Sequence, residues 1–155
     1  MAALTEGDDA PDFELARAGG GSIRLSDLRG QPVVVYFYPK DDTASCTRQA
    51  IGFSESADEF RAAGAEIIGI SPDGIKSHDK FRNKHALTII LGADEEKEAI
   101  GAYGVWAQKQ MYGRTYMGVV RSTFLIGRDG KIARIWRGVR VPGHVAEVLA
   151  AVKAL

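Results

Sequence analysis

Residues 36–47 read Tyr36-Phe37-Tyr38-Pro39-Lys40-Asp41-Asp42-Thr43-Ala44-Ser45-Cys46-Thr47, and they contain the only cysteine of the 155 residues. The residues from Val33 to Tyr38 form an unbroken run of β-branched and aromatic side chains. Such a run predicts a strand that is buried on both faces. Pro39 ends this strand, because proline cannot donate to a sheet hydrogen-bond ladder.

The residues after this strand predict a helix that begins just before Cys46. Apolar side chains recur at helical spacing from Cys46 to Phe60. Thr43 or Ser45 can cap the start of this helix, and Gly64 can close it. The unpaired N–H groups of a helix start carry partial positive charge, which stabilises a thiolate relative to the thiol. Cys46 is therefore a candidate nucleophile, although lone cysteines on apolar helix faces more commonly only pack.

The rest of the chain alternates strands with helices. Strands are predicted at 66–71, 87–91 and 121–127, with a hairpin partner at 132–136 after an Asp-Gly turn. Helices are predicted at 75–85, from Asp94 to Ile100 and from Pro142 onward. The aromatic and methionine-rich residues 103–118 are expected to form a loop that packs on the core, walls the site or contacts another subunit. The alternation predicts an α/β fold with a mixed sheet, and residues 1–155 are expected to form a single domain.

Composition excludes few functions but gives a consistent setting. Lys plus Arg and Asp plus Glu are 20 each, so the formal net charge is zero and does not indicate binding to nucleic acid or to a membrane surface. The first residues lack the basic segment and apolar core of a signal peptide. No apolar run approaches the length of a membrane span. One cysteine cannot form an internal disulfide, which is consistent with a cytoplasmic location.

The segment from Tyr38 to Thr47 resembles the active-site segment of peroxiredoxins, in particular the bacterioferritin comigratory protein group, also called peroxiredoxin Q. The shared pattern Pro-x-x-x-Thr-x-x-Cys is filled by Pro39, Thr43 and Cys46. Further matches are Gly7-Asp8-Asp9-Ala10-Pro11-Asp12-Phe13, Gly104-Val105-Trp106 and Arg121-Ser122-Thr123-Phe124-Leu125-Ile126. The resemblance implies a thioredoxin-like fold with a central mixed β-sheet flanked by helices and an N-terminal extension.

The resemblance also implies an enzyme, a thioredoxin-dependent peroxiredoxin that reduces hydrogen peroxide and organic hydroperoxides through a sulfenic acid on Cys46. In such an enzyme Thr43 and Arg121 stabilise the displacement, and Pro39 shields the thiolate. The strand pattern alone leaves an ordinary ion pair as the alternative for Arg121. The implied role is antioxidant defence and redox homeostasis, with no metal and no other cofactor.

Two positions depart from the group's pattern. Glycine usually precedes the cysteine, whereas this chain has Ser45. Many members carry a second cysteine five residues after the first, whereas this chain has Ile51. The thiol that reduces the sulfenic acid must therefore come from thioredoxin, glutaredoxin or glutathione, or from Cys46 of another subunit. The last route needs two Cα atoms within about 7 Å, so we expect an external thiol and a monomer or weak homodimer.

Two further function classes fit the sequence less well. A disulfide oxidoreductase needs a Cys-x-x-Cys pair, and Gln49 occupies the second position. A non-enzymatic holdase or redox-sensing protein would be separated from an enzyme by a peroxide-consumption assay. The charged residues Lys40, Asp41 and Asp42 are expected to be solvated. The histidines, which are His78, His85 and His144, are expected to be surface or packing residues.

Overall fold

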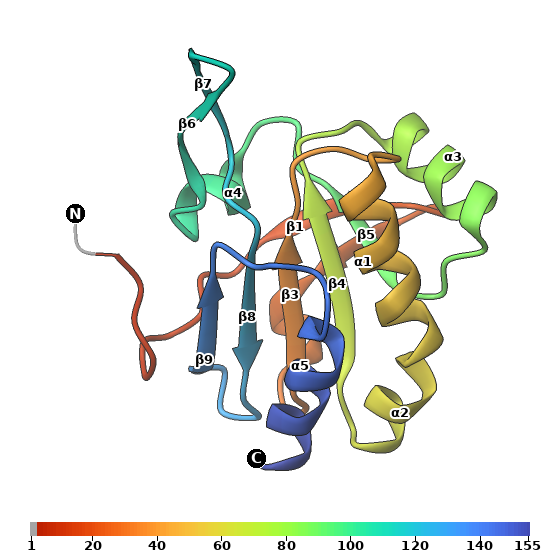
Figure 1. The fold of residues 1–155 in the computed structure, drawn as a ribbon. Helices are drawn as coiled ribbons and strands as arrows, with labels where there is room; N and C mark the ends of the chain where they lie inside the picture. The colour runs from red at the N-terminus through yellow and green to blue at the C-terminus, as the bar shows by residue number, and fades with distance from the viewer. Residues whose placement is uncertain (1–2) are drawn as a thin grey trace.

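The computed structural model describes residues 3–155, and a β-sheet runs through its centre (Figure 1). The sheet strands are β1 (Glu14–Arg17), β2 (Ser22–Arg24), β3 (Val33–Phe37), β4 (Glu66–Ser71), β5 (Ile90–Ala93), β8 (Ser122–Ile126) and β9 (Ile132–Arg137). A separate two-stranded sheet consists of β6 (Trp106–Met111) and β7 (Arg114–Val119). The helices are η1 (Leu25–Leu28), α1 (Ala44–Glu55), α2 (Ala57–Ala62), α3 (Ile75–His85), α4 (Glu98–Ala102) and α5 (His144–Lys153).

The strand order of the central sheet is β2-β1-β5-β4-β3-β8-β9. β3 pairs parallel with β4 and antiparallel with β8, so the predicted mixed sheet is confirmed. Tyr36 lies beside Gly69 in this pairing. A Cβ atom on Gly69 would lie 2.7 Å from the Tyr36 ring, which is too close for any side chain. Glycine at this position therefore lets the Tyr36 ring lie across β4.

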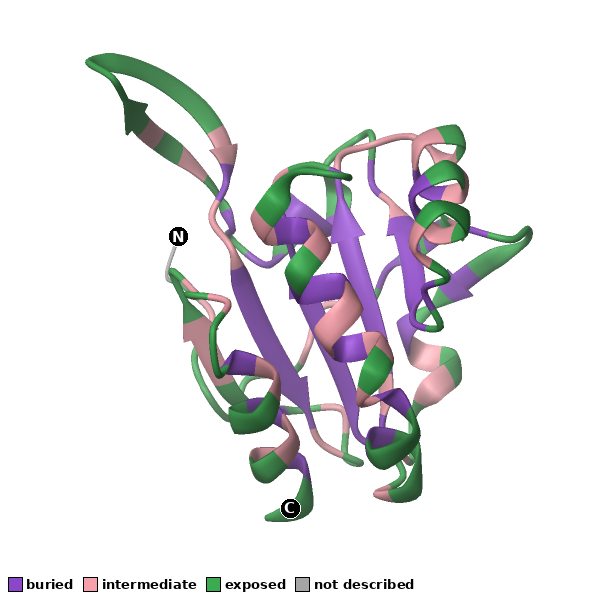
Figure 2. Ribbon diagram, turned by 45° about the vertical axis from the view of Figure 1, so that its right-hand side comes forward, coloured by how far each residue is buried: buried purple, intermediate pink, exposed green. Residues whose placement is uncertain are grey.

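Both faces of the sheet are covered, and the central strands are buried along their length (Figure 2). Val33, Val35 and Phe37 point to a core that includes residues of η1 and α4. The alternate residues of β3 point to the opposite core, which α1, α2, α3 and α5 cover. This burial on both faces confirms the prediction that the apolar run beginning at Val33 forms a strand buried on both faces. No helix in residues 3–155 is both long and apolar enough to cross a membrane.

The helix after β3 is broken, unlike the single helix predicted up to Gly64. α1 ends at Glu55, and α2 begins after Ser56. Phe53 and Phe60 are seven residues apart. On a straight helix, that separation corresponds to about 10 Å along the axis. Their ring centroids are only 5.8 Å apart. The break at Ser56 therefore lets the second phenylalanine turn back onto the first.

Residues 103–118 do not form the predicted loop. Most of them form the β6–β7 hairpin, which projects from the body beyond one end of the sheet (Figure 1). Its two-residue turn has positive φ angles at Tyr112 (52°) and Gly113 (74°). Two such angles match the hairpin turn whose twist suits antiparallel strands. The strands could not be recognised in the sequence, because most of their side chains are exposed and apolar and polar residues do not alternate as they do on a half-buried strand.

Three boundaries differ from the sequence-based expectation. β5 begins at Ile90 rather than Leu87, after a left-handed residue at Ala86 ends α3. α4 begins at Glu98, because Lys97 has a φ of 58°. Asp94 instead caps α4 from outside, and its carboxylate accepts the N–H groups of Glu98 at 2.9 Å and Ile100 at 2.8 Å. α5 begins at His144, two residues after Pro142.

Candidate active site

Cys46 lies in the first turn of α1, as the sequence predicted. The first hydrogen bond within the helix runs from the Thr47 N–H to the Thr43 carbonyl at 2.8 Å. The N–H groups of the residues between them therefore have no partner inside the helix. The Cys46 side chain is a free thiol, and the residue is 2% exposed. A thiolate at this position faces the positive end of the helix and is sheltered from bulk water.

Arg121 contacts Cys46 directly. One guanidinium nitrogen, Nη2, lies 3.2 Å from the Cys46 sulfur. The other, Nη1, donates to Oε1 of Gln49 at 2.6 Å. Gln49 lies one turn after Cys46 on α1. The planar guanidinium is therefore held at two points of one helix, and one of its N–H groups points at the sulfur.

The predicted start of the strand at Arg121 is wrong. β8 begins at Ser122, so Arg121 precedes the strand. The alternation of a strand over 121–127 predicts that Arg121 shares one face with Val119, Thr123 and Leu125. Leu125 packs in the core that contains Cys46, whereas Val119 packs in the opposite core, so this common face does not extend to Val119. The chain bends between β7 and β8, where the Val120 N–H bonds to the Val105 carbonyl at 2.7 Å. This bend directs the Arg121 side chain to Cys46 instead of along a strand face.

Pro39 and Thr43 bracket the loop between β3 and α1. Pro39 is half-buried and directly follows Tyr38, whose N–H still bonds to the Ile70 carbonyl of β4 at 3.0 Å. Thr43 occupies the N-cap position of α1, but its side chain does not cap the helix. Its hydroxyl instead donates to the Lys40 carbonyl at 3.0 Å. The two lone pairs of this hydroxyl oxygen therefore remain able to accept a hydrogen bond.

Two buried residues near Cys46 were not identified from the sequence. The Gln49 side chain is fully buried, and among the described residues its Nε2 has no hydrogen-bond partner. Tyr36 is also fully buried, and its hydroxyl likewise finds no partner within residues 3–155. Burial raises the pKa of Tyr36 far above its ordinary value, and negative charge on Cys46 adds to that rise while Arg121 opposes it. The Tyr36 hydroxyl therefore stays protonated within the core that also contains Cys46.

Lys109 on β6 adds a third positive group to this environment. Its aliphatic stem crosses over Gly118 of β7, where a Cβ atom would lie 3.2 Å from the lysine Cδ. Burial lowers the pKa of Lys109, and Arg121 lowers it further, while negative charge on Cys46 opposes both effects. The hairpin thus carries a cation whose charge acts on both Arg121 and Cys46. No local pattern indicated a role for Lys109, because residues 103–118 were expected to be a loop.

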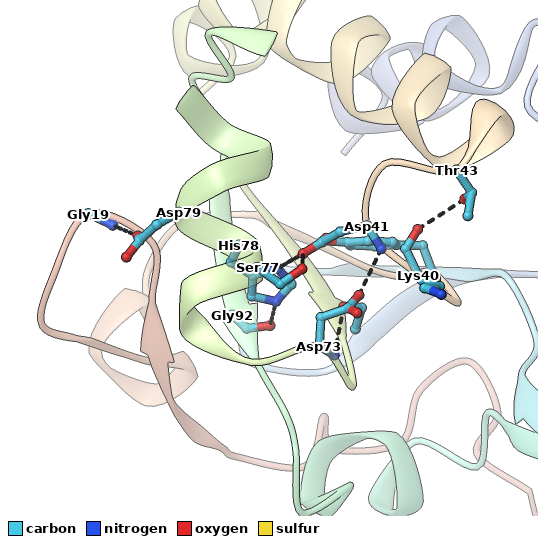
Figure 3. A network of polar contacts seen from close by, with 11 residues as sticks. Gly19, Lys40, Asp41, Thr43, Asp73, Ser77, His78, Asp79 and Gly92 are labelled. Carbon is cyan, nitrogen blue, oxygen red and sulfur yellow. Dashed lines mark hydrogen bonds and ion pairs between the residues drawn. The ribbon is translucent and has the colours of Figure 1, made fainter. Parts of the chain in front are cut away.

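The expectation of solvated charges is wrong for Asp41, which is 7% exposed. Figure 3 shows it between Asp73, Ser77 and His78. The His78 ring is fully buried, and its Nδ1 lies 2.7 Å from the Asp41 carboxylate. Asp42 is exposed, as expected, but it pairs with Lys84 and His85. The loop before α1 is therefore attached to α3 through two adjacent aspartates.

Known proteins resemble this chain over most of its length. The AhpC/TSA family model matches residues 6–135. Peroxiredoxin Bcp of Bacillus subtilis (strain 168) is 45% identical over 147 residues, which cover 95% of this chain and 94% of that protein. Peroxiredoxin Bcp of Escherichia coli (strain K12) is 40% identical over 149 residues, 96% of each chain.

Solved structures agree as well. A peroxiredoxin Q of Xanthomonas campestris superposes with a TM-score of 0.87 at 41% identity, covering 92% of this chain and 90% of that chain. A Xylella fastidiosa PrxQ mutant superposes with a TM-score of 0.93 at 36% identity, covering 99% and 98%. These matches confirm the thioredoxin-like fold that the resemblance implied. The chain therefore belongs to the AhpC/TSA family and is a thiol peroxidase of the Bcp, or peroxiredoxin Q, group of peroxiredoxins.

Proposed function

We propose that Cys46 is the peroxidatic nucleophile and that Arg121, Thr43 and Pro39 complete its site. The observation that carries this proposal is the 3.2 Å contact between the Arg121 guanidinium and the Cys46 sulfur at the start of α1. A charged donor and a helix start both favour the thiolate form, which is the reactive form of cysteine. Residues 1–155 act as one domain in this proposal.

The reaction is a displacement at a peroxide oxygen. The thiolate sulfur of Cys46 attacks one oxygen of R–O–O–H, so an S–O bond forms and the O–O bond breaks. The leaving alkoxide or hydroxide keeps the electron pair of the broken bond and takes up a proton. The products are a sulfenic acid on Cys46 and an alcohol or water.

The other residues act on the developing negative charge. Arg121 donates to the sulfur and to the attacked oxygen, and its fixed orientation avoids reorganisation during the reaction. The Thr43 oxygen, whose proton is already donated to Lys40, accepts the peroxide O–H and orients the oxygen under attack. Pro39 excludes water from the thiolate. Both hydrogen peroxide and organic hydroperoxides are substrates, and a bacterioferritin comigratory protein of Xanthomonas campestris is described for its alkyl peroxide reduction activity.

An external thiol closes the cycle, because Cys46 is the only cysteine. The thiol sulfur attacks the sulfenic sulfur, water leaves, and a mixed disulfide forms. A second thiol then attacks the external sulfur of this mixed disulfide. Cys46 is released as the thiolate, and the two external thiols leave as a disulfide. Thioredoxin, glutaredoxin and glutathione all fit this chemistry, and the enzyme works in the cytoplasm as a monomer or weak homodimer.

Intact mass spectrometry after one equivalent of peroxide tests this proposal. We expect one added oxygen on Cys46, reversal by added thioredoxin or glutathione, and two or three added oxygens when peroxide is in excess without thiol. The Cys46→Ser variant should consume no peroxide. Peroxide consumption by that variant at the wild-type rate would contradict the role of Cys46. A dominant Cys46–Cys46 dimer that thioredoxin reduces at once would contradict the external-thiol route alone.

A further inference from the structure

The loop of residues 39–43, which leads into α1, is attached to α3 at an inner and an outer point. The inner point is Asp41, which contacts Ser77 and His78 near the start of α3. The outer point is Asp42, which contacts Lys84 and His85 near its end. Two adjacent residues of the loop are thus bound by opposite ends of one helix.

The inner point is a buried and fully paired carboxylate. Oδ1 of Asp41 accepts the Tyr38 hydroxyl at 2.6 Å, and Oδ2 accepts the Ser77 hydroxyl at 2.8 Å. His78 Nδ1 lies 2.7 Å from the same Oδ2 (Figure 3). The Asp41 N–H donates to the Asp73 carboxylate at 2.8 Å. Both the side chain and the backbone of Asp41 are therefore fixed.

The His78 ring is itself held from both sides. Nε2 lies 2.9 Å from the Gly92 carbonyl of β5, which can only accept. Nε2 is therefore the donor of that bond, and one further proton lies between Nδ1 and the Asp41 carboxylate. Burying a charged or polar pair is favourable only when its hydrogen bonds are made, and here every one of these groups is paired. The central sheet thus fixes the loop through His78.

The outer point constrains the backbone of the same loop. Asp42 has a φ of 62°, a left-handed conformation that aspartate tolerates better than most residues. Its carboxylate accepts Lys84 Nζ at 2.6 Å and lies 2.9 Å from His85 Nε2. Hydrogen bonds from His85 and Lys84 hold the pKa of the Asp42 carboxyl below its ordinary value. Asp42 is nevertheless exposed, so we assign the larger effect to Asp41.

We propose that Asp41 and His78 are positioning residues for peroxide reduction, because they hold the loop that places Thr43 and the first turn of α1 around the Cys46 sulfur. The inference rests on the proposed role of Cys46. The Thr43 hydroxyl bonds to the Lys40 carbonyl, so a shift of the loop at Asp41 moves Thr43 with it. Misplacing reacting groups by about 1 Å can cost a hundred-fold in rate.

The test compares two substitutions of His78. His78→Phe keeps a ring but leaves the Asp41 carboxylate without its third donor. His78→Asn loses the Gly92 bond as well as the ring, but its amide nitrogen can occupy the place of Nδ1 and donate to Asp41. Rapid-mixing measurement of Cys46 oxidation by hydrogen peroxide should show a loss of about ten-fold or more for the first variant and a loss of at most about three-fold for the second. Equal rates in these two variants would overturn the proposal.

A matched control separates positioning from stability. Tyr103→Phe removes a hydrogen bond of similar length, 2.7 Å to the Pro11 carbonyl, from a core residue on the opposite face of the sheet. We expect a lowered melting temperature but an oxidation rate within about two-fold of the wild type. If His78→Phe and Tyr103→Phe slow the reaction equally, His78 has only a structural role.

Two more variants keep the test decisive. Asp41→Asn should slow oxidation, and the double variant with His78→Phe should be no slower than the worse single variant, because both remove one unit. If the losses of oxidation rate in the two single variants add in the double variant, Asp41 and His78 do not act as one pair. Ser77→Ala removes one of the three side-chain donors to the Asp41 carboxylate and should fold normally. We expect only about a two- to three-fold loss of oxidation rate, because Tyr38 and His78 still hold the carboxylate. If Cys46→Ser abolishes peroxide consumption while all these variants oxidise at the wild-type rate, the positioning proposal fails and the role of Cys46 stands.

Discussion

The loop of residues 39–43 and the β6–β7 hairpin lead into the two halves of the site, but they are held in opposite ways. The loop precedes Cys46, and its Asp41 is buried in a network of polar contacts. The hairpin precedes Arg121, and its tip residue Tyr112 is 97% exposed. Burial is confined to the base of the hairpin, at Val105 and Val119. We therefore expect the position of Cys46 to depend on the contacts of the loop with α3, and the position of Arg121 to depend little on the hairpin.

Arg121 keeps its position through neighbours other than the hairpin. Its carbonyl accepts the Val139 N–H at 2.9 Å, and its side chain is held by Gln49. Ser122 directly after it is fully buried in β8. Substitutions that act through these contacts should therefore have large effects, and substitutions in the hairpin should have small ones.

The largest effect is expected for Arg121→Lys, which keeps the charge but removes the two-pronged contact. A hydrogen bond to a charged group is worth about 1–3 kcal/mol, so Cys46 oxidation should slow by ten-fold or more. Rapid-mixing kinetics with hydrogen peroxide measure this rate. Arg140→Lys, at an exposed position, is the matched control and should be unchanged. Wild-type kinetics in a folded Arg121→Lys protein would show that Arg121 does not act on the sulfur.

The second effect concerns the strand that follows Arg121. His144 of α5 is buried, and its Nε2 lies 2.8 Å from the Thr123 hydroxyl of β8. Burial lowers the pKa of His144 to about 4, while Glu147 opposes this and Arg121 adds to it. In the unfolded chain the His144 side chain binds a proton with its ordinary pKa near 6.5. The contribution of neutral His144 to stability is therefore fully present above that pH and is lost as the pH falls toward 4.

Because the unfolded chain binds one more proton than the folded chain, the free energy of unfolding should fall by about 2 kcal/mol between pH 6.5 and 4.5. Urea unfolding at several pH values measures it. His144→Gln cannot take up this proton, so its free energy of unfolding should fall less steeply over the same range. Identical slopes for the two proteins would show that His144 does not stay neutral in the folded state.

A smaller effect is expected for Gln49→Leu, which removes the acceptor that orients Arg121. The buried amide already lacks one partner, so an apolar side chain of similar size should cost little stability. The oxidation rate should fall by about three- to ten-fold, less than a full hydrogen bond to a charged group would give, because the guanidinium keeps its contact with the Cys46 sulfur. Thermal unfolding checks stability separately. An unchanged rate would mean that the strand alone orients the guanidinium.

The smallest effect is expected on the hairpin. Lys109→Met removes a partly exposed charge, so the oxidation rate should fall by only about two-fold and the difference should shrink at high salt. Tyr112→Ser at the hairpin tip is the control, and it should change neither the rate nor the melting temperature. A ten-fold loss for Lys109→Met would show that the hairpin positions the reaction as strongly as the loop does.

The sequence predicted the core elements because their apolar periodicity is local. β3, β4 and α3 lie where expected, and Cys46 lies at the start of its helix. The hairpin was missed because its outward side chains are apolar, so neither strand shows a buried face. Breaks such as Ser56 depend on how Phe60 packs against Phe53, which is decided by tertiary contacts.

The site was predictable only in part. The approach of Arg121 to Cys46 joins residues 75 positions apart, and the family resemblance rather than any local pattern indicated it. Asp41 and His78 are 37 positions apart. Asp41 fills an unspecified position of the Pro-x-x-x-Thr-x-x-Cys pattern, and His78 lies outside that pattern. Adjacent charged residues in a loop ordinarily remain in solvent, so the burial of Asp41 required a partner that only the folded chain supplies.

The burial of Cys46 also bears on the size of the molecules that reach it. With the residue only 2% exposed, we expect a small peroxide to reach the sulfur more readily than a bulky thiol does. If the reductant is another protein, we therefore expect its reaction to require an opening of the first turn of α1 that peroxide does not need. Stronger attachment of the loop should speed oxidation but slow reduction. We therefore expect turnover with a protein reductant to depend on how readily the start of α1 opens.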